Sequence, residues 1–134
     1  MPFDSVRIGN IANITSEPKL QDKLYEALAV QFMKRGVRVS DSSDNVFEGR
    51  INFFSVFTLT EKKGYASDYE VVAKGDFTLR RADGTVRNLK GMTSVFSETF
   101  ESADRLNELV AHQESADDRA IEGLALRIIS ELLY

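Results

Sequence analysis

Two neighbouring cations, Lys62 and Lys63, stand directly before Gly64 and are the clearest candidates for binding an anionic group. A lysine ammonium is a compact charge with three hydrogen-bond donors, so a pair of them at a turn can engage an anion. A turn that only keeps the surface solvated would have the same composition. The sequence leaves both interpretations open at this position.

Groups suited to metal binding are few. His112 is the single histidine and there is no cysteine, so neither a His-rich nor a His/Cys metal site can be assembled. Two acidic groups could ligate a hard cation, but neither has the glycine and terminal glutamate of an EF-hand loop; they are Asp41, Asp44 and Glu48, and Glu114, Asp117 and Asp118. We interpret His112 as a surface residue and the carboxylates as solvated charges, and we expect neither a metal nor a cofactor.

Motifs for nucleophilic or phosphate chemistry are also missing from the sequence. No Gly-x-Ser-x-Gly arrangement marks an activated serine, and the eight glycines are scattered singly instead of forming a phosphate loop. The sequence therefore favours a protein that binds over an enzyme.

An aromatic segment offers a second candidate for binding: Phe47, Phe53, Phe54 and Phe57 follow one another closely. These rings would ordinarily be the core of a sheet. If some of them face outward instead, they would meet a partner or a lipid chain, because exposed apolar area on a small sheet is unusual without one.

Length and composition indicate a single domain over residues 1–134. The apolar fraction of 43% is enough for one core, and 17 basic against 21 acidic residues give a net charge of −4. That balance argues against a nucleic-acid surface spread over the molecule. The N-terminal residues lack the basic flank and apolar run of a secretory signal, and no apolar run is long enough for a membrane-spanning helix.

The first part of the chain predicts a strand and then a helix. Thr15 or Ser16 can cap the helix, Pro18 suits its first turn, and Gly36 stops it. The apolar residues that define the two elements are Val6, Ile8 and Ile11 for the strand and Leu20, Leu24, Leu28 and Phe32 for the helix.

Three long segments after the polar loop 40–45 predict an antiparallel meander. The alternation of apolar and polar residues over 46–60 places Phe47, Ile51 and Phe53 on one face, and it changes phase near Phe53 and Phe54, which indicates a β-bulge. The returning strand is less regular over 73–75, and Asp83-Gly84 predicts a tight hairpin turn. In the last strand, residues 86–100, the expected core contributors are Val95, Phe96 and Phe100.

The remaining residues predict a helix with a 3.6-residue apolar period through Ile121, Leu124 and Ile128. It begins either near Ala103 or at the polar stretch 114–118, which resembles a capping box. The order β-α-β-β-β-α indicates an α+β fold with two helices packed on one face of a four-stranded sheet.

Several motifs occur in a distinctive order: an Asn-x-Thr-x-Glu-Pro-x-Leu pattern over 13–20, then Phe32 with Arg35-Gly36, and Val46 with Glu48-Gly49 and Ile51. Their order and spacing resemble the LptE family of outer-membrane lipopolysaccharide-assembly lipoproteins. The likeness continues through Tyr69 and Asp83-Gly84 to the last helix, so it covers nearly the whole chain. It implies two helices on a mixed four-stranded sheet.

The resemblance implies a role as a non-enzymatic assembly factor. Such proteins plug and help assemble an LptD-type β-barrel and contact lipopolysaccharide, on the periplasmic side of the cell outer membrane. Another envelope lipoprotein interaction module, of the secretion-channel or cell-wall-synthase activator type, is the alternative, because it shares this order of elements.

The resemblance also implies that basic residues at one end of the sheet meet the lipid A phosphates. Lys62 lies in the matching turn with Lys63 beside it, and Arg105 is the candidate for the second basic position near the start of the last helix. The lipid-bearing N-terminal cysteine of such lipoproteins is missing from this sequence. We expect that a segment preceding residue 1 has been removed from this sequence, and that the full-length protein is anchored by acyl chains.

Overall fold

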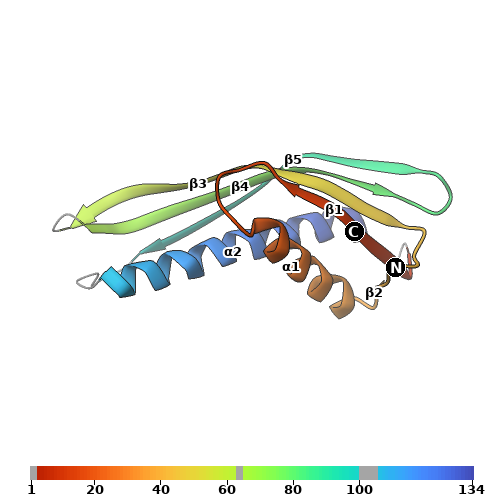
Figure 1. Ribbon diagram of the computed structural model, residues 1–134, viewed down its shortest axis with the longest axis horizontal. Helices are drawn as coiled ribbons and strands as arrows, with labels where there is room; N and C mark the ends of the chain where they lie inside the picture. The colour runs from red at the N-terminus through yellow and green to blue at the C-terminus, as the bar shows by residue number, and fades with distance from the viewer. Residues whose placement is uncertain (1–2, 63–64, 100–105) are drawn as a thin grey trace.

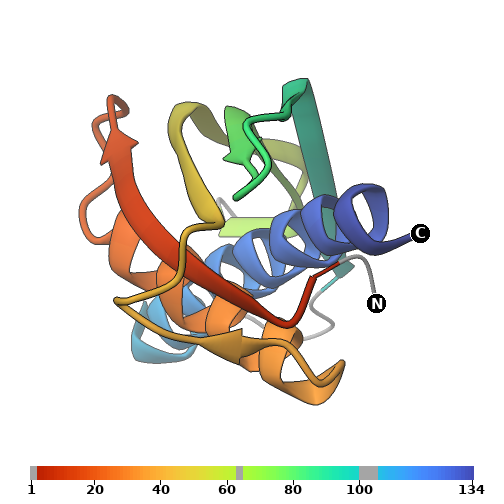
Figure 2. The same cartoon turned by 90° about the vertical axis from the view of Figure 1, so that its right-hand side faces the viewer.

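The structure, a computed structural model, describes residues 3–62, 65–99 and 106–134, and the side chains of residues 3–57, 68, 70–98 and 115–134. The elements in chain order are β1 (Ser5–Asn13), α1 (Leu20–Lys34), β2 (Arg38–Val39), β3 (Val46–Lys62), β4 (Tyr65–Arg80), β5 (Val86–Thr99) and α2 (Leu106–Leu133). Both helices lie against the same face of one curled sheet (Figures 1 and 2). The α+β class and the helix-on-sheet arrangement are confirmed.

The sheet is mixed and has five strands in the order β2-β1-β3-β4-β5. β1 is parallel to β2 and to β3, whereas β3, β4 and β5 form an antiparallel meander. The expectation of four strands was wrong, because β2 is a strand of its own at the edge. It consists only of Arg38 and Val39, paired with Ser5 and Val6, and is too short to show an alternating pattern.

Helix α1 buries the stripe that the sequence indicated. Leu20, Leu24, Leu28 and Phe32 are completely inaccessible to solvent. At its C-terminus, Gly36 adopts a φ of 80°, and the N–H groups of Gly36 and Val37 donate to the carbonyl oxygens of Met33 and Phe32, at 3.1 and 2.9 Å. This is a Schellman motif, so the expected glycine stop is confirmed.

The expected N-cap of α1 was wrong. The cap position is Lys19, with a φ of 67° and no side-chain cap. The Thr15 hydroxyl instead donates to the Asn13 side chain at 2.7 Å and accepts the Glu17 N–H at 3.2 Å. Thr15 is therefore committed to the turn between β1 and α1, before the helix begins.

Helix α2 starts at Leu106, near the earlier of the two expected positions, and residues 114–118 lie inside it. Its C-terminal half joins α1 and the sheet in the main core, whereas Ala116 and Ala120 form a second cluster with Val71. Phe54 contacts both clusters, so a continuous apolar layer runs beneath β3 and β4. The buried residues of α2 include the predicted Ile121, Leu124 and Ile128.

Strand β3 contains a β-bulge, as expected, one residue earlier than the change of phase suggested. Ile51 pairs with Gly75 and Phe53 with Lys74, so Asn52 is left without a partner on β4. Ile51 is buried, Asn52 and Phe53 are exposed, and the inward series resumes with Phe54. The sequence-based expectation that Phe53 shares a face with Ile51 was therefore wrong.

A second bulge lies on β5 at the same level of the sheet. Gly75 pairs with Met92 and Phe77 with Leu89, so Lys90 and Gly91 together stand opposite Asp76. Gly91 has a φ of 66°, which a glycine adopts without strain. Over residues 71–79 β4 keeps strict alternation, and the irregularity that the sequence suggested at 73–75 belongs to its two neighbours.

The carboxylate of Asp76 joins the two bulges. One oxygen accepts the side-chain N–H of Asn52 at 2.9 Å, and the other accepts the backbone N–H of Gly91 at 2.8 Å. Arg50 lies 3.6 Å from the same carboxylate. One side chain thus accepts a backbone N–H of the β5 bulge and the side-chain N–H of the extra residue in the β3 bulge.

On the opposite face of the sheet from the Asp76 carboxylate, the ring of Phe77 lies over two glycines. A Cβ atom at Gly49 or at Gly75 would come within 2.4 or 2.5 Å of the ring, and Phe77 also stacks on Phe47 with ring centroids 5.5 Å apart. Side chains at these two positions would displace the ring, so the glycines are a packing requirement of the core.

The predicted hairpin between β4 and β5 is also present. Gly84 has a φ of 89°, and the Asp83 side chain accepts hydrogen bonds from the hydroxyl and the backbone N–H of Thr85, at 2.6 and 2.9 Å. These two bonds to Thr85 lower the pKa of the Asp83 carboxyl.

We expect Asp76→Ala to lower the free energy of unfolding by about 1–3 kcal/mol, because it leaves the Asn52 amide and the Gly91 N–H without their charged acceptor. Asp76→Asn keeps an oxygen for Gly91, so its free energy of unfolding should lie between that of the native chain and that of Asp76→Ala. Urea denaturation followed by circular dichroism measures both. Glu70→Ala, on the same strand and sheet face, is the control, and an equal loss in this control would contradict the role given to Asp76.

Candidate functional site

The cationic residues predicted to meet an anion are placed only in part. Lys62 is the last residue of β3 and pairs with Tyr65 of β4, which confirms that the chain reverses here. The side chain of Lys62, and Lys63 and Arg105 altogether, lie outside the described residues. The grouping of these three cations therefore stays a prediction.

The ends of the elements that lead to these cations lie at one end of the molecule. The end of β3, the start of β4 and the first turn of α2 are at the same end of the long axis in Figure 1. β5 also finishes there, because Thr99 pairs with Asp68. Lys62 and the first turn of α2 thus belong to the same end of the sheet.

An outer apolar patch, defined by Phe53, Phe57 and Val95, lies on the sheet face away from the helices. The three side chains are 38, 44 and 56% exposed. Between them Val72 pairs with Ser55 on one side and with Val95 on the other, and it is nearly buried although no helix covers this face. The alternative that some aromatic residues of β3 face outward is thereby confirmed.

A cation borders the outer apolar patch. The ammonium of Lys74 lies 5.1 Å from the centroid of the Phe53 ring, within the range of a cation–π contact. The patch therefore combines exposed apolar area with a positive charge that a ligand or partner could meet.

Val95 was expected in the core, and its exposure has a structural reason. On the far side of the β5 bulge, Ser94 and Phe96 turn toward α2, and Val95 between them turns outward. Ser94 is 5% exposed, and a Cβ atom at Gly123 would come within 2.6 Å of its hydroxyl oxygen. The close approach of α2 at Gly123 requires a small inward residue here, which a polarity pattern does not indicate.

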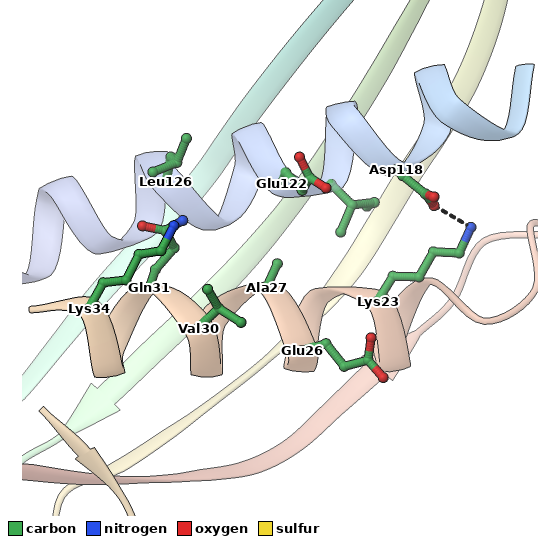
Figure 3. Close-up of a pocket in the computed structure, with 10 residues that line it drawn as sticks. Lys23, Glu26, Ala27, Val30, Gln31, Lys34, Asp118, Glu122 and Leu126 are labelled. Carbon is green, nitrogen blue, oxygen red and sulfur yellow. Dashed lines mark ion pairs between the residues drawn. The ribbon is translucent and has the colours of Figure 1, made fainter. Parts of the chain in front are cut away.

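A groove of about 540 Å³ runs between the two helices on the side opposite the sheet (Figure 3). Lys23 of α1 and Asp118 of α2 form an ion pair of 2.6 Å across it. Its lining alternates apolar and charged side chains from both helices: Lys23, Glu26, Ala27, Val30, Gln31, Lys34, Asp118, Ile121, Glu122 and Leu126. Both signs of charge are present, so the groove does not select an anion or a cation.

Within the described part of the chain, no group of three or more His, Asp or Glu side chains is arranged to hold a metal ion. None of the helical segments described is both long and apolar enough to cross a membrane. The hairpin end, the outer apolar patch and the helix groove are three surfaces of the described residues that are available for recognition.

The fold places the chain in a class of helix-on-sheet domains found in several solved bacterial proteins. A minor lipoprotein from Acinetobacter baumannii is 16% identical with a TM-score of 0.61, covering 96% of this chain and 90% of that one. Rare lipoprotein B from Shewanella oneidensis is 13% identical with a TM-score of 0.56, covering 94% and 92%. The PelC dodecamer from Paraburkholderia phytofirmans is 19% identical with a TM-score of 0.52, covering 95% and 89%. At these identities the likeness shows the fold.

The family itself is shown by a sequence model. The model of the LptE family, described as lipopolysaccharide-assembly, matches residues 3–132. This chain belongs to the LptE family, as its motifs suggested. A comparison with curated protein sequences gives no significant match.

The two neighbours Phe53 and Phe54 should respond oppositely to the same substitution. Phe54→Ala removes a ring shared by both core clusters and should cost about 3 kcal/mol, whereas Phe53→Ala, on the outer face, should cost about 1 kcal/mol or less. Urea denaturation measures the two costs. Retention on a hydrophobic-interaction column should fall for Phe53→Ala, and equal costs would contradict the described bulge.

Proposed function

We propose that this chain is a lipopolysaccharide-assembly factor that plugs an LptD-type β-barrel, helps it assemble and contacts lipopolysaccharide. The observation that carries this proposal is the match of the family model over nearly the whole chain. The role requires recognition without bond-making, and the chain is accordingly proposed not to be an enzyme.

The geometry of the described residues supports two kinds of contact. The outer apolar patch offers Phe53, Phe57 and Val95 to an enclosing partner, which would remove their exposed area from water. The end of the β3–β4 hairpin offers Lys62 to an anion, with Lys63 beside it in the sequence. Hydrogen bonds between ammonium groups and phosphate oxygens are among the stronger polar contacts.

The proposed location follows from the proposed role. The domain acts at the periplasmic side of the cell outer membrane, and acyl chains on an N-terminal cysteine of the full-length protein hold it there. Acylation supplies membrane affinity in proportion to the number of buried methylene groups, so the domain need not enter the bilayer itself.

Capture from outer membranes tests the partner. The full-length, lipidated protein, extracted under conditions that preserve complexes, should recover a large β-barrel protein in comparable amount. A double substitution on the outer apolar patch, Phe53→Asp with Phe57→Asp, should lower recovery several-fold, because each carboxylate would lose its hydration in the contact. Recovery of envelope proteins without any β-barrel would contradict the proposal and favour the secretion-channel or cell-wall-synthase type of module.

Lipopolysaccharide binding tests the cationic residues. We expect Lys62→Ala with Lys63→Ala to weaken binding about tenfold at low salt, and less at high salt, because counterions screen exposed charges. Arg105→Ala should weaken it further if this residue completes the site. Arg80→Ala with Lys90→Ala removes the same charge from exposed residues of β4 and β5 on the side of the β4–β5 hairpin and is the matched control. Binding unchanged by the Lys62 and Lys63 substitutions would remove both residues from the site.

A further inference from the structure

The β5 edge of the sheet has free hydrogen-bonding capacity. β5 is the last strand in the sheet order and, among the described residues, pairs only with β4. The other edge is β2, which is only two residues long. In an antiparallel strand every second residue turns both its N–H and its C=O away from its neighbour, so β5 presents a row of these groups to its open side.

The two halves of this edge differ in how they are protected against pairing. Before and at the bulge, residues 86–91 carry Arg87 and Lys90, and the bulge itself bends the strand. Beyond it, Met92–Glu98 contains no lysine, arginine or proline, and its one charged residue is Glu98. Basic residues and bulges are the usual means of blocking an edge, and they are confined here to the first half.

The sequence of the open half is complementary to itself. If two copies pair in antiparallel fashion about a twofold axis at Val95, Thr93 stands opposite Ser97, Ser94 opposite Phe96, and Met92 opposite Glu98. No two like charges face each other in this register, and Val95 meets Val95 on the outer face. Directly opposite apolar side chains stabilise a strand pair, and this one covers a residue that is 56% exposed.

We propose that Met92–Glu98 of β5 pairs with the same segment of a second copy, antiparallel and centred on Val95. Among possible binding partners, an extended chain matches a row of alternating backbone donors and acceptors, whereas a lipid chain or a phosphate does not. A second copy is favoured over another polypeptide by the self-complementary register. The inference concerns the chain alone and does not depend on its role with a β-barrel.

Single-cysteine variants give a direct test, because the chain has no cysteine of its own. Directly opposite residues of an antiparallel pair are close enough for a disulfide. Val95→Cys, under mild oxidation, should convert most of the protein to a covalent dimer. Val86→Cys, 52% exposed on the same strand but beyond the bulge, is the matched control and should stay largely monomeric. Equal crosslinking of the two variants overturns the proposal.

A mixed experiment tests the register. Thr93→Cys mixed with Ser97→Cys should give a crosslinked heterodimer in excess of either homodimer, because these positions face each other only if the axis passes through Val95. If the crosslinked homodimers formed in the same amount as the heterodimer, this register would be excluded.

Association in solution is the second measurement. Sedimentation of the native chain over a concentration series should show a reversible dimer, and Val95→Lys should shift its dissociation constant upward at least tenfold by placing two like charges opposite each other. Val86→Lys should leave it unchanged, with circular dichroism confirming the fold of both variants. A native chain that remains monomeric throughout the series overturns the proposal.

Discussion

The surfaces of this domain depend on the carboxylate of Asp76, which joins the two β-bulges that cross the sheet. Asn52 on β3 and Gly91 on β5 stand on either side of it, and each donates a hydrogen bond to a different oxygen. Without these bulges the inward series of β3 and β5 would continue unbroken past Asp76. With them, the sheet bends along the line from Asn52 through Asp76 to Gly91. Beyond this line, β3 and β5 each turn a different series of residues toward the helices.

This change determines what is buried beyond the line. On β3 the inward positions pass from Ile51 to Phe54, so Phe53 becomes part of the outer face and Phe54 links the two core clusters. On β5 they pass from Leu89 to Met92, so Val95 is exposed. β4 has no extra residue at this level and keeps the same alternation from Val71 to Leu79. Under the bend, Phe77 fills the space above Gly49 and Gly75, which only residues without a side chain leave open.

Local features were predictable from the sequence because their causes are local. The stripe from Leu20 to Phe32, the stop at Gly36 and the Asp83-Gly84 turn each follow from a few adjacent residues. The motifs also indicated the family correctly. The faces of Phe53 and Val95 were not predictable, because they depend on contacts of Asp76 with residues on two other strands. The short β2 has no periodicity of its own and exists through its pairing with β1. The proposed cations Lys62, Lys63 and Arg105 remain predictions from resemblance.

The outer apolar patch and the β5 edge meet at Val95, so partners of the two surfaces affect each other. Cross-strand neighbours point to the same side of a sheet, and a twofold pair at Val95 would therefore place the outer faces of both copies side by side. Pairing through the edge would enlarge the outer apolar patch instead of covering it, since Phe53 and Phe57 lie on β3, away from the edge. A partner that encloses the sheet must instead approach both the patch and the edge. Binding of a second copy and enclosure by a β-barrel would then compete for the same segment of β5.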